Sequence, residues 1–209
     1  MSDSSCIRKP AVAGSFYPSD PVKLRTDLRA MLDDVGELPA MGRPLVLVEP
    51  HAGYVYSGRV AAHGYSLLEN LNIDTVVVVS PSHAEHFPFV SVFDGDAYET
   101  PLGRIPVDKP TARDIVSADP ILRLSGNGHI QNGEASREHA LEVQLPFLQT
   151  VLDEFCIVPI VMGDQSWETC QALGNALGPI LKRDNVITVI SSDLSHFYPH
   201  NVAAEMDGV

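Results

Sequence analysis

The stretch LVLVEPHAGY at residues 45–54 decides the fold. Four apolar residues and a glutamate lead into a proline, a histidine and a glycine. The same design recurs in TVVVVSPSH at residues 75–83 and in VITVISSDLSH at residues 186–196. Each apolar run is continuous and rich in β-branched residues, which predicts a strand buried on both faces of a sheet.

A histidine follows each of these predicted strands, namely His51, His83 and His196. In open α/β sheets ligands bind at the carboxyl ends of the strands, so we expect the three imidazoles to meet in one cavity. Two neutral imidazoles at strand ends can hold a first-row metal ion such as iron, copper or zinc. Either His51 or His83 alone fits an ordinary loop histidine, but their matching positions favour a metal site.

Helical patterns separate the predicted strands. Apolar residues recur at helical spacing in residues 20–34, 58–69, 138–152 and 166–181. Pro146 is expected to kink the third of these helices. A further strand at residues 155–161 contains Pro159, which predicts a sheet edge or a bulge. The alternation predicts an α/β fold with a mainly parallel or mixed central sheet and helices on both faces.

The composition narrows the classes of function. A net charge of −13 argues against a nucleic-acid partner and against an anionic membrane surface. We find no apolar run of about 18 residues that would span a membrane, and the polar residues 1–5 do not resemble a signal peptide. The three cysteines form an odd set without paired spacing, which predicts a reducing, cytoplasmic environment.

Asp193 and His196 form a second candidate pair. An imidazole is a natural general acid or base near neutral pH, and a carboxylate can fix its tautomer. Asp193 is also a candidate metal ligand. The same residues fit a helix-capping turn in which Ser192 or Asp193 is the N-cap, and the two interpretations are compatible.

Three further positions carry candidate chemistry. His139 lies at i, i+3 spacing from Glu142 on a predicted helix, which fits a catalytic or metal-binding wall or a solvated helix face. Tyr54 and Ser82 lie beside the strand-end histidines and are candidates for hydrogen bonds to a substrate, although an aromatic residue such as Tyr54 also fits a core edge. The sequence does not support a hydrolase function, because it contains neither a Gly-x-Ser-x-Gly elbow nor a phosphate-binding glycine loop.

Five motifs occur in a fixed order along the chain. They are PAVAGSFYP (10–18), PHAGY (50–54), SPSH (80–83), EHALEVQLP (138–146) and SSDLSH (191–196). With these motifs the chain resembles the Memo family, whose bacterial and archaeal members are also called AmmeMemoRadiSam system protein B. The resemblance covers essentially the whole chain and implies a single Memo-like domain over residues 1–209, with an N-terminal arm at residues 1–18.

The Memo family resembles class III extradiol dioxygenases in fold. Those enzymes hold non-haem Fe(II) with two histidines and one carboxylate, and they open catechol rings with O₂. The resemblance implies that His51 and His83 match the metal-binding histidines. It also implies that His196, with Asp193 beside it, matches the acid/base histidine, and that His139 matches another histidine of the pocket.

The resemblance also implies a missing part. In Memo proteins the third metal ligand is a cysteine in a later segment, so we expect the C-terminal portion of the family fold to be absent after residue 209. Two imidazoles alone bind a metal ion weakly, because an open facial site needs three protein ligands. The chain would then be a fragment, a truncated gene product, or a protein that a partner completes.

Two functions follow as expectations. The first is a metal-dependent redox protein of dioxygenase type, with iron or copper and a small-molecule substrate that the sequence does not identify. The alternative is a non-catalytic adaptor that binds a peptide or partner protein on the same fold, since some eukaryotic relatives are described as binding phosphotyrosine peptides. Gene association in the family implies an AMMECR1-domain protein and a radical SAM protein as partners.

Overall fold

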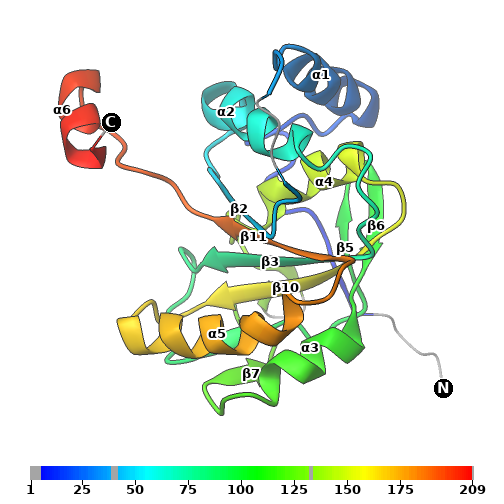
Figure 1. Cartoon of the computed structure of the whole chain (residues 1–209), viewed down its shortest axis with the longest axis vertical. Helices are drawn as coiled ribbons and strands as arrows, with labels where there is room; N and C mark the ends of the chain where they lie inside the picture. Colours follow the sequence, from blue (N-terminus) through cyan, green and yellow to red (C-terminus); the bar gives the residue numbers. More distant parts are fainter. Residues whose placement is uncertain (1–5, 39–41, 132–133, 209) are drawn as a thin grey trace.

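A six-stranded sheet forms the centre of the structure (Figure 1). The structure is a computed structural model that describes residues 6–38, 42–131 and 134–208. In spatial order the strands are β2 (Val46–Glu49), β11 (Val186–Ser191), β3 (Thr75–Pro81), β10 (Cys156–Met162), β4 (Val90–Val92) and β7 (Leu122–Leu124). The first four are parallel, β4 is antiparallel to β10, and β7 is parallel to β4. The predicted mainly parallel sheet is confirmed.

Helices cover both faces of this sheet, as predicted. One face carries α1 (Pro21–Asp33), α2 (Tyr54–Ser66) and α4 (Leu145–Val151), and the other carries α3 (Lys109–Val116) and α5 (Trp167–Ile180). The helix starts follow local chemistry. Asp20 caps α1 by accepting a hydrogen bond from the Lys23 backbone N–H at 2.7 Å, and Ser166 caps α5 through the Thr169 N–H.

Smaller elements surround the main sheet. They are β1 (Ile7–Arg8), β5 (Ala97–Thr100), β6 (Gly103–Pro106), β8 (Ile130–Gln131), β9 (Glu134–Ala135), the 3₁₀ helix η1 (Glu142–Gln144) and α6 (His200–Asp207). Strand β1 pairs with β5, which pairs with β6, so part of the predicted N-terminal arm is a strand of a second sheet. Residues 1–5 of that arm, and Val209, lie outside the described residues. No helix within the described ranges is long and apolar enough to cross a membrane.

Pro159 does not lie at a sheet edge, contrary to the prediction. Strand β10 is internal, between β3 and β4. The carbonyl oxygen of Pro159 accepts a hydrogen bond from the Phe93 N–H on the β4 side, just past the last residue pair between the two strands. The nitrogen of Pro159 points to the same side, so the parallel ladder with β3 loses no donor.

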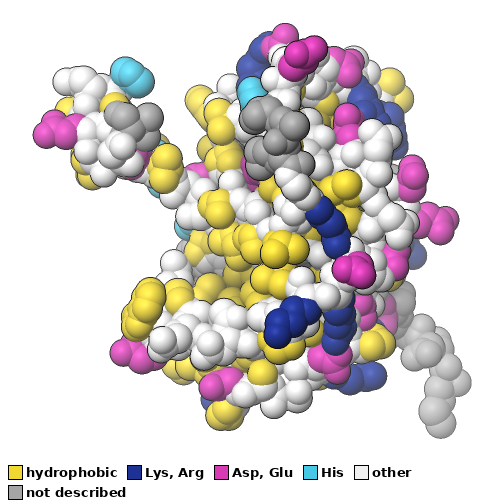
Figure 2. All heavy atoms as spheres, in the orientation of Figure 1, with side chains coloured by type: hydrophobic (Ala, Val, Ile, Leu, Met, Phe, Trp, Pro, Cys, Tyr) yellow, Lys and Arg dark blue, Asp and Glu magenta, His cyan; other side chains and the backbone are white. Residues whose placement is uncertain are grey.

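Strand β2 is buried on one face only, which also differs from the prediction. It is an edge strand, and Val46 and Val48 are 42% and 66% exposed. The side chains of α5 pack on β3 and β10 and do not extend over β2. Figure 2 shows hydrophobic side chains gathered on the face between α2 and α5, where Leu45, Val46 and Val48 are exposed.

A neutral histidine lies inside the core beneath the second sheet. His129 is fully buried, its Nδ1 is hydrogen-bonded to the Tyr98 hydroxyl, and its Nε2 lies 3.3 Å from the Ser91 carbonyl oxygen. Burial lowers the pKa of His129 to about 3. The folded protein therefore excludes a proton that the unfolded chain binds below about pH 6.5.

Acid should destabilise the protein through this group. Because the pKa of His129 is depressed in the folded state, its contribution is fully present above pH 6.5 and is lost as the pH falls. Between pH 7 and about pH 4.5 the free energy of unfolding should drop by about 2.5 kcal/mol through His129. In urea unfolding, the free energy of unfolding of the His129→Gln variant should depend less steeply on pH, by the uptake of one proton on unfolding. The exposed control His63→Gln should match the parent. Equal slopes for all three proteins would contradict this assignment.

Candidate metal centre

Three histidines meet at the carboxyl edge of the main sheet. His51 follows β2, His83 follows β3, and His139 precedes η1. One ligand nitrogen from each lies within 4.8 Å of the other two. The ring centroids are 5.1 Å apart for His51 and His83, and 4.7 Å apart for His83 and His139. This cluster is called the three-histidine centre below.

Parallel pairing explains why two of the three histidines meet. Strands β2, β11 and β3 are adjacent and parallel, so their carboxyl ends share one edge of the sheet. His51 and His83 leave the two outer strands, and Ser191 ends the strand between them. His139 comes from a different segment, above this edge.

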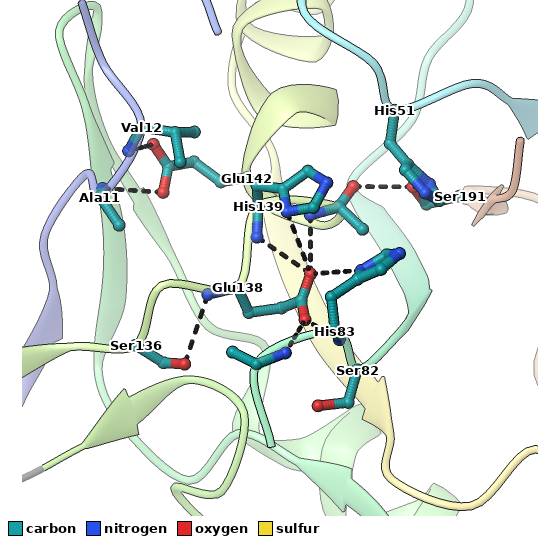
Figure 3. Close-up of polar contacts among 12 residues, drawn as sticks. Ala11, Val12, His51, Ser82, His83, Ser136, Glu138, His139, Glu142 and Ser191 are labelled. Atoms are coloured by element: carbon teal, nitrogen blue, oxygen red, sulfur yellow. Dashed lines mark hydrogen bonds and ion pairs between the residues drawn. The ribbon is translucent and has the colours of Figure 1, made fainter. Parts of the chain in front are cut away.

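Glu138 joins the His83 and His139 segments (Figure 3). Its buried carboxylate accepts hydrogen bonds from Nδ1 of His83 at 3.1 Å and from the His83 backbone N–H. It also accepts from the backbone N–H groups of Ala84 (3.3 Å), His139 (2.9 Å) and Ala140 (2.9 Å). Burial raises the pKa of Glu138, but these hydrogen bonds outweigh it and the net pKa is lowered. An ionised Glu138 can only accept, so Nδ1 of His83 carries the proton and Nε2 is free to bind a metal ion.

The same carboxylate explains a difference from the predicted helix. The sequence pattern predicts a helix from residue 138 with a kink at Pro146. The backbone N–H groups of His139 and Ala140 bond to Glu138, and regular structure begins only with η1 at Glu142. Pro146 then lies in the first turn of α4, where a proline fits without a kink.

His51 is held on two sides. Its Nδ1 lies 2.9 Å from the Ser191 hydroxyl, and its backbone N–H donates to Oδ1 of Asp193 at 2.7 Å. Its Nε2 lies 3.6 Å from Oδ2 of Asp193. Asp193 thus pairs with His51, whereas the sequence pairs it with His196.

Two imidazoles of the centre, those of His51 and His139, favour the neutral form. Burial lowers the pKa of His51, and the Asp193 carboxylate partly opposes that effect. Burial also lowers the pKa of His139, against the opposing charge of Glu138. Neutral imidazole is the form that binds metal ions, so both residues are in the ligand form at neutral pH.

A cleft of about 440 Å³ opens beside the centre. His51, His83, Asp193 and His196 line it, and Val79, Met162 and Ile190 form an apolar part of its wall. His196 is exposed, and its Nδ1 lies 2.9 Å from the Leu194 carbonyl oxygen. All three strand-end histidines therefore reach one cleft, but the third member of the compact cluster is His139.

The other predicted site residues differ in placement. Ser82 lines the cleft, and its hydroxyl donates to the Glu85 carbonyl oxygen at 2.6 Å. Tyr54 is buried, and its hydroxyl donates to the Val143 carbonyl oxygen at 2.7 Å. The structure thus places Tyr54 in the core, and a substrate contact for it stays a prediction. Glu142 is fully buried against Arg8 and is not part of the centre.

The donor set fits a metal ion. Nitrogen ligands at about 2.1 Å from a metal ion stand about 3–3.4 Å apart, so nitrogens within 4.8 Å of one another need to close by at most about 1.8 Å. Nε2 of His51 and Oδ2 of Asp193 lie 3.6 Å apart. A cation between them would contact both groups.

The structure is an α/β protein with a histidine-rich cleft at the strand ends, and it is consistent with the extradiol dioxygenase-like fold. The family model described as "Memo-like protein" matches residues 8–208. A MEMO1 family protein of Methanothermobacter thermautotrophicus is 37% identical over 96% of this chain and 74% of its own length. MEMO1 family proteins of Sulfolobus acidocaldarius (36%, over 97% and 74%) and Metallosphaera sedula (34%, over 96% and 73%) are similar as well. The chain belongs to the Memo-like family.

Residues that the sequence analysis did not select also shape the centre. Glu138 bonds to His83 and His139, Ser191 bonds to His51, and Gln144 bonds to Ser191. The position of Glu138 directly before His139 was the available signal. Ser191 and Gln144 carried none, because their roles depend on tertiary contacts between segments about 50 residues or more apart in sequence.

Proposed function

We propose that this protein is a metal-dependent redox protein that binds one iron or copper ion between His51, His83 and His139. The convergence of three imidazole nitrogens within 4.8 Å carries the proposal. Imidazole suits iron and copper among the first-row metals. A bound ion would supply the electron-transfer and O₂ chemistry that the side chains of the cleft lack.

The residues around the centre are proposed to bind the substrate and to transfer protons. The cleft offers an apolar wall to the body of a small molecule, and none of the described residues that line it is a lysine or an arginine. An uncharged, oxygen-bearing small molecule therefore fits it better than a phosphorylated one. At the rim, His196 is proposed to move a proton, and Asp193 is proposed to hold His51 and to assist as a proton acceptor.

Metal uptake tests the first part of the proposal. The purified chain, loaded anaerobically with Fe(II) or Cu(II) and desalted, should retain about one ion per chain by elemental analysis. The variants His51→Ala, His83→Ala and His139→Ala should each lose most of it, because two remaining imidazoles bind weakly. The control His63→Ala removes an exposed histidine of α2 and should retain the ion. Unchanged stoichiometry in the first three variants would rule out the centre.

Oxygen uptake tests the second part. The iron-loaded chain should consume O₂ in the presence of a catechol, the substrate class of the dioxygenases that the family resembles. His196→Gln should slow the consumption and leave metal content unchanged. If the chain binds one ion but consumes no O₂ with any catechol of a test series, the metal site is supported and the dioxygenase-type reaction is ruled out.

A binding protein is the second candidate, and one observation favours it. The segment after β11 exposes Leu194, Phe197 and Tyr198 beside the cleft, with Phe197 98% exposed. Exposed apolar and aromatic side chains of this kind serve protein contacts. A metal-free, folded chain that captures a peptide or a partner protein in a pull-down would support this role. The AMMECR1-domain and radical SAM proteins are the partners we propose to test, and the cytoplasm is the compartment we propose.

A further inference from the structure

A buried chain of hydrogen bonds runs from helix α2 to His51. The Tyr65 hydroxyl donates to Oε1 of Gln144 at 2.6 Å, and Nε2 of Gln144 donates to the Ser191 hydroxyl at 2.8 Å. The Ser191 hydroxyl in turn lies 2.9 Å from Nδ1 of His51. All four side chains are buried. Of these, His51 belongs to the three-histidine centre, and Tyr65, Gln144 and Ser191 lie outside it.

The orientation of Gln144 is fixed by a group that can only accept. Its Nε2 lies 3.0 Å from the carbonyl oxygen of Pro50. A carbonyl oxygen has no proton to offer, so the NH₂ end of the amide must face Pro50. The oxygen end then faces Tyr65, whose hydroxyl is the donor.

The proton of Ser191 is fixed in the same way. Its hydroxyl lies 2.7 Å from the carbonyl oxygen of Ala140, which can only accept, so the single hydroxyl proton is used there. The lone pairs of Ser191 must then accept from both remaining neighbours. One is the amide of Gln144, and the other is Nδ1 of His51.

We infer that Ser191 and Gln144 are positioning residues that hold His51 in the Nδ1–H tautomer and so keep its Nε2 free. The inference rests on the proposed function only in its consequence for metal binding. Without the Ser191 acceptor, His51 can take the opposite tautomer, in which Nε2–H donates to Oδ2 of Asp193, now 3.6 Å away. That proton occupies the nitrogen that faces the centre.

Two measurements test the inference on the full chain. In the metal-free protein, ¹⁵N imidazole shifts should report His51 as the Nδ1–H tautomer, and Ser191→Ala should move it to the Nε2–H tautomer. In titrations with Fe(II), Ser191→Ala should weaken metal affinity about 10- to 100-fold. Ser192→Ala removes the adjacent exposed serine and should change neither result. Tyr65→Phe removes only the far donor and should give a smaller loss of affinity than Ser191→Ala.

The outcomes separate this inference from the proposed function. If the parent chain binds the ion and Ser191→Ala keeps both tautomer and affinity, the inference is wrong and the metal site stands. If the parent binds no ion, the proposed function fails, and the tautomer measurement still decides the role of Ser191. Should Ser191→Ala not fold, the metal-free parent decides the matter. An Nε2–H tautomer of His51 in the parent would overturn the inference.

Discussion

Replacing Glu142 with alanine should lower the free energy of unfolding by about 3–5 kcal/mol, the usual cost of breaking a buried ion pair from one side. Glu142 is fully buried, and its carboxylate pairs with the Arg8 guanidinium, itself 1% exposed. It also accepts hydrogen bonds from the backbone N–H groups of Ala11 (2.8 Å) and Val12 (3.0 Å), and from the Tyr17 hydroxyl at 2.6 Å. Alanine leaves all these donors, one of them charged, without their acceptor.

A double-mutant cycle checks the origin of the loss. Urea unfolding of Arg8→Met, Glu142→Ala and the double variant should give a double-variant cost well below the sum of the single costs, because removing both partners leaves no buried charge. Glu205→Ala, which removes an exposed carboxylate of α6, is the matched control and should stay within about 0.5 kcal/mol of the parent. Additive single costs would show that the ion pair does not hold the N-terminal segment in place.

Replacing Glu138 with alanine should weaken metal affinity about 100-fold and lower the free energy of unfolding by about 3 kcal/mol. The carboxylate accepts from both segments that carry His83 and His139, so its loss frees Nδ1 of His83 and leaves the buried N–H of Ala140 unpaired. Both histidines then lose their fixed orientation.

The two effects of Glu138→Ala can be measured apart. Urea unfolding of the metal-free chain gives the stability term, and titration with Fe(II) gives the affinity term. Glu138→Gln keeps the size of the side chain and one acceptor oxygen, so it should lie between alanine and the parent in both measurements. Parent-like affinity in Glu138→Ala would show that His83 is oriented by other contacts.

The meeting of His51 and His83 could be predicted from the sequence because it depends on local patterns. Continuous apolar runs define parallel strands, and a residue that follows such a strand must lie at the carboxyl edge of the sheet. The same reasoning placed His196 at the cleft. It could not place His139 in the compact cluster, because that position is set by the buried carboxylate of Glu138 and not by a strand end.

Two errors of the sequence analysis have a common cause. Pro159 suggested a sheet edge, but its missing N–H falls where the pairing with β4 has already ended. The apolar run of β2 suggested burial on both faces, but no described helix covers the face that carries Val46 and Val48. Which neighbour lies beside a strand is a tertiary property that the periodicity of the strand does not contain.

Helix α6 contributes no buried residue and stands apart from the body of the protein, at the end of the segment that follows Ser191 (Figure 1). Asp193 and His196 belong to that segment, whereas His51, His83 and His139 lie at the carboxyl edge of the main sheet. In the proposed function, ion binding and proton transfer therefore fall to separate parts of one cleft. A load on this segment therefore reaches Asp193 and His196 first. Asp193 in turn contacts His51 through the hydrogen bond from the His51 backbone and through its Oδ2, which lies 3.6 Å from Nε2 of His51.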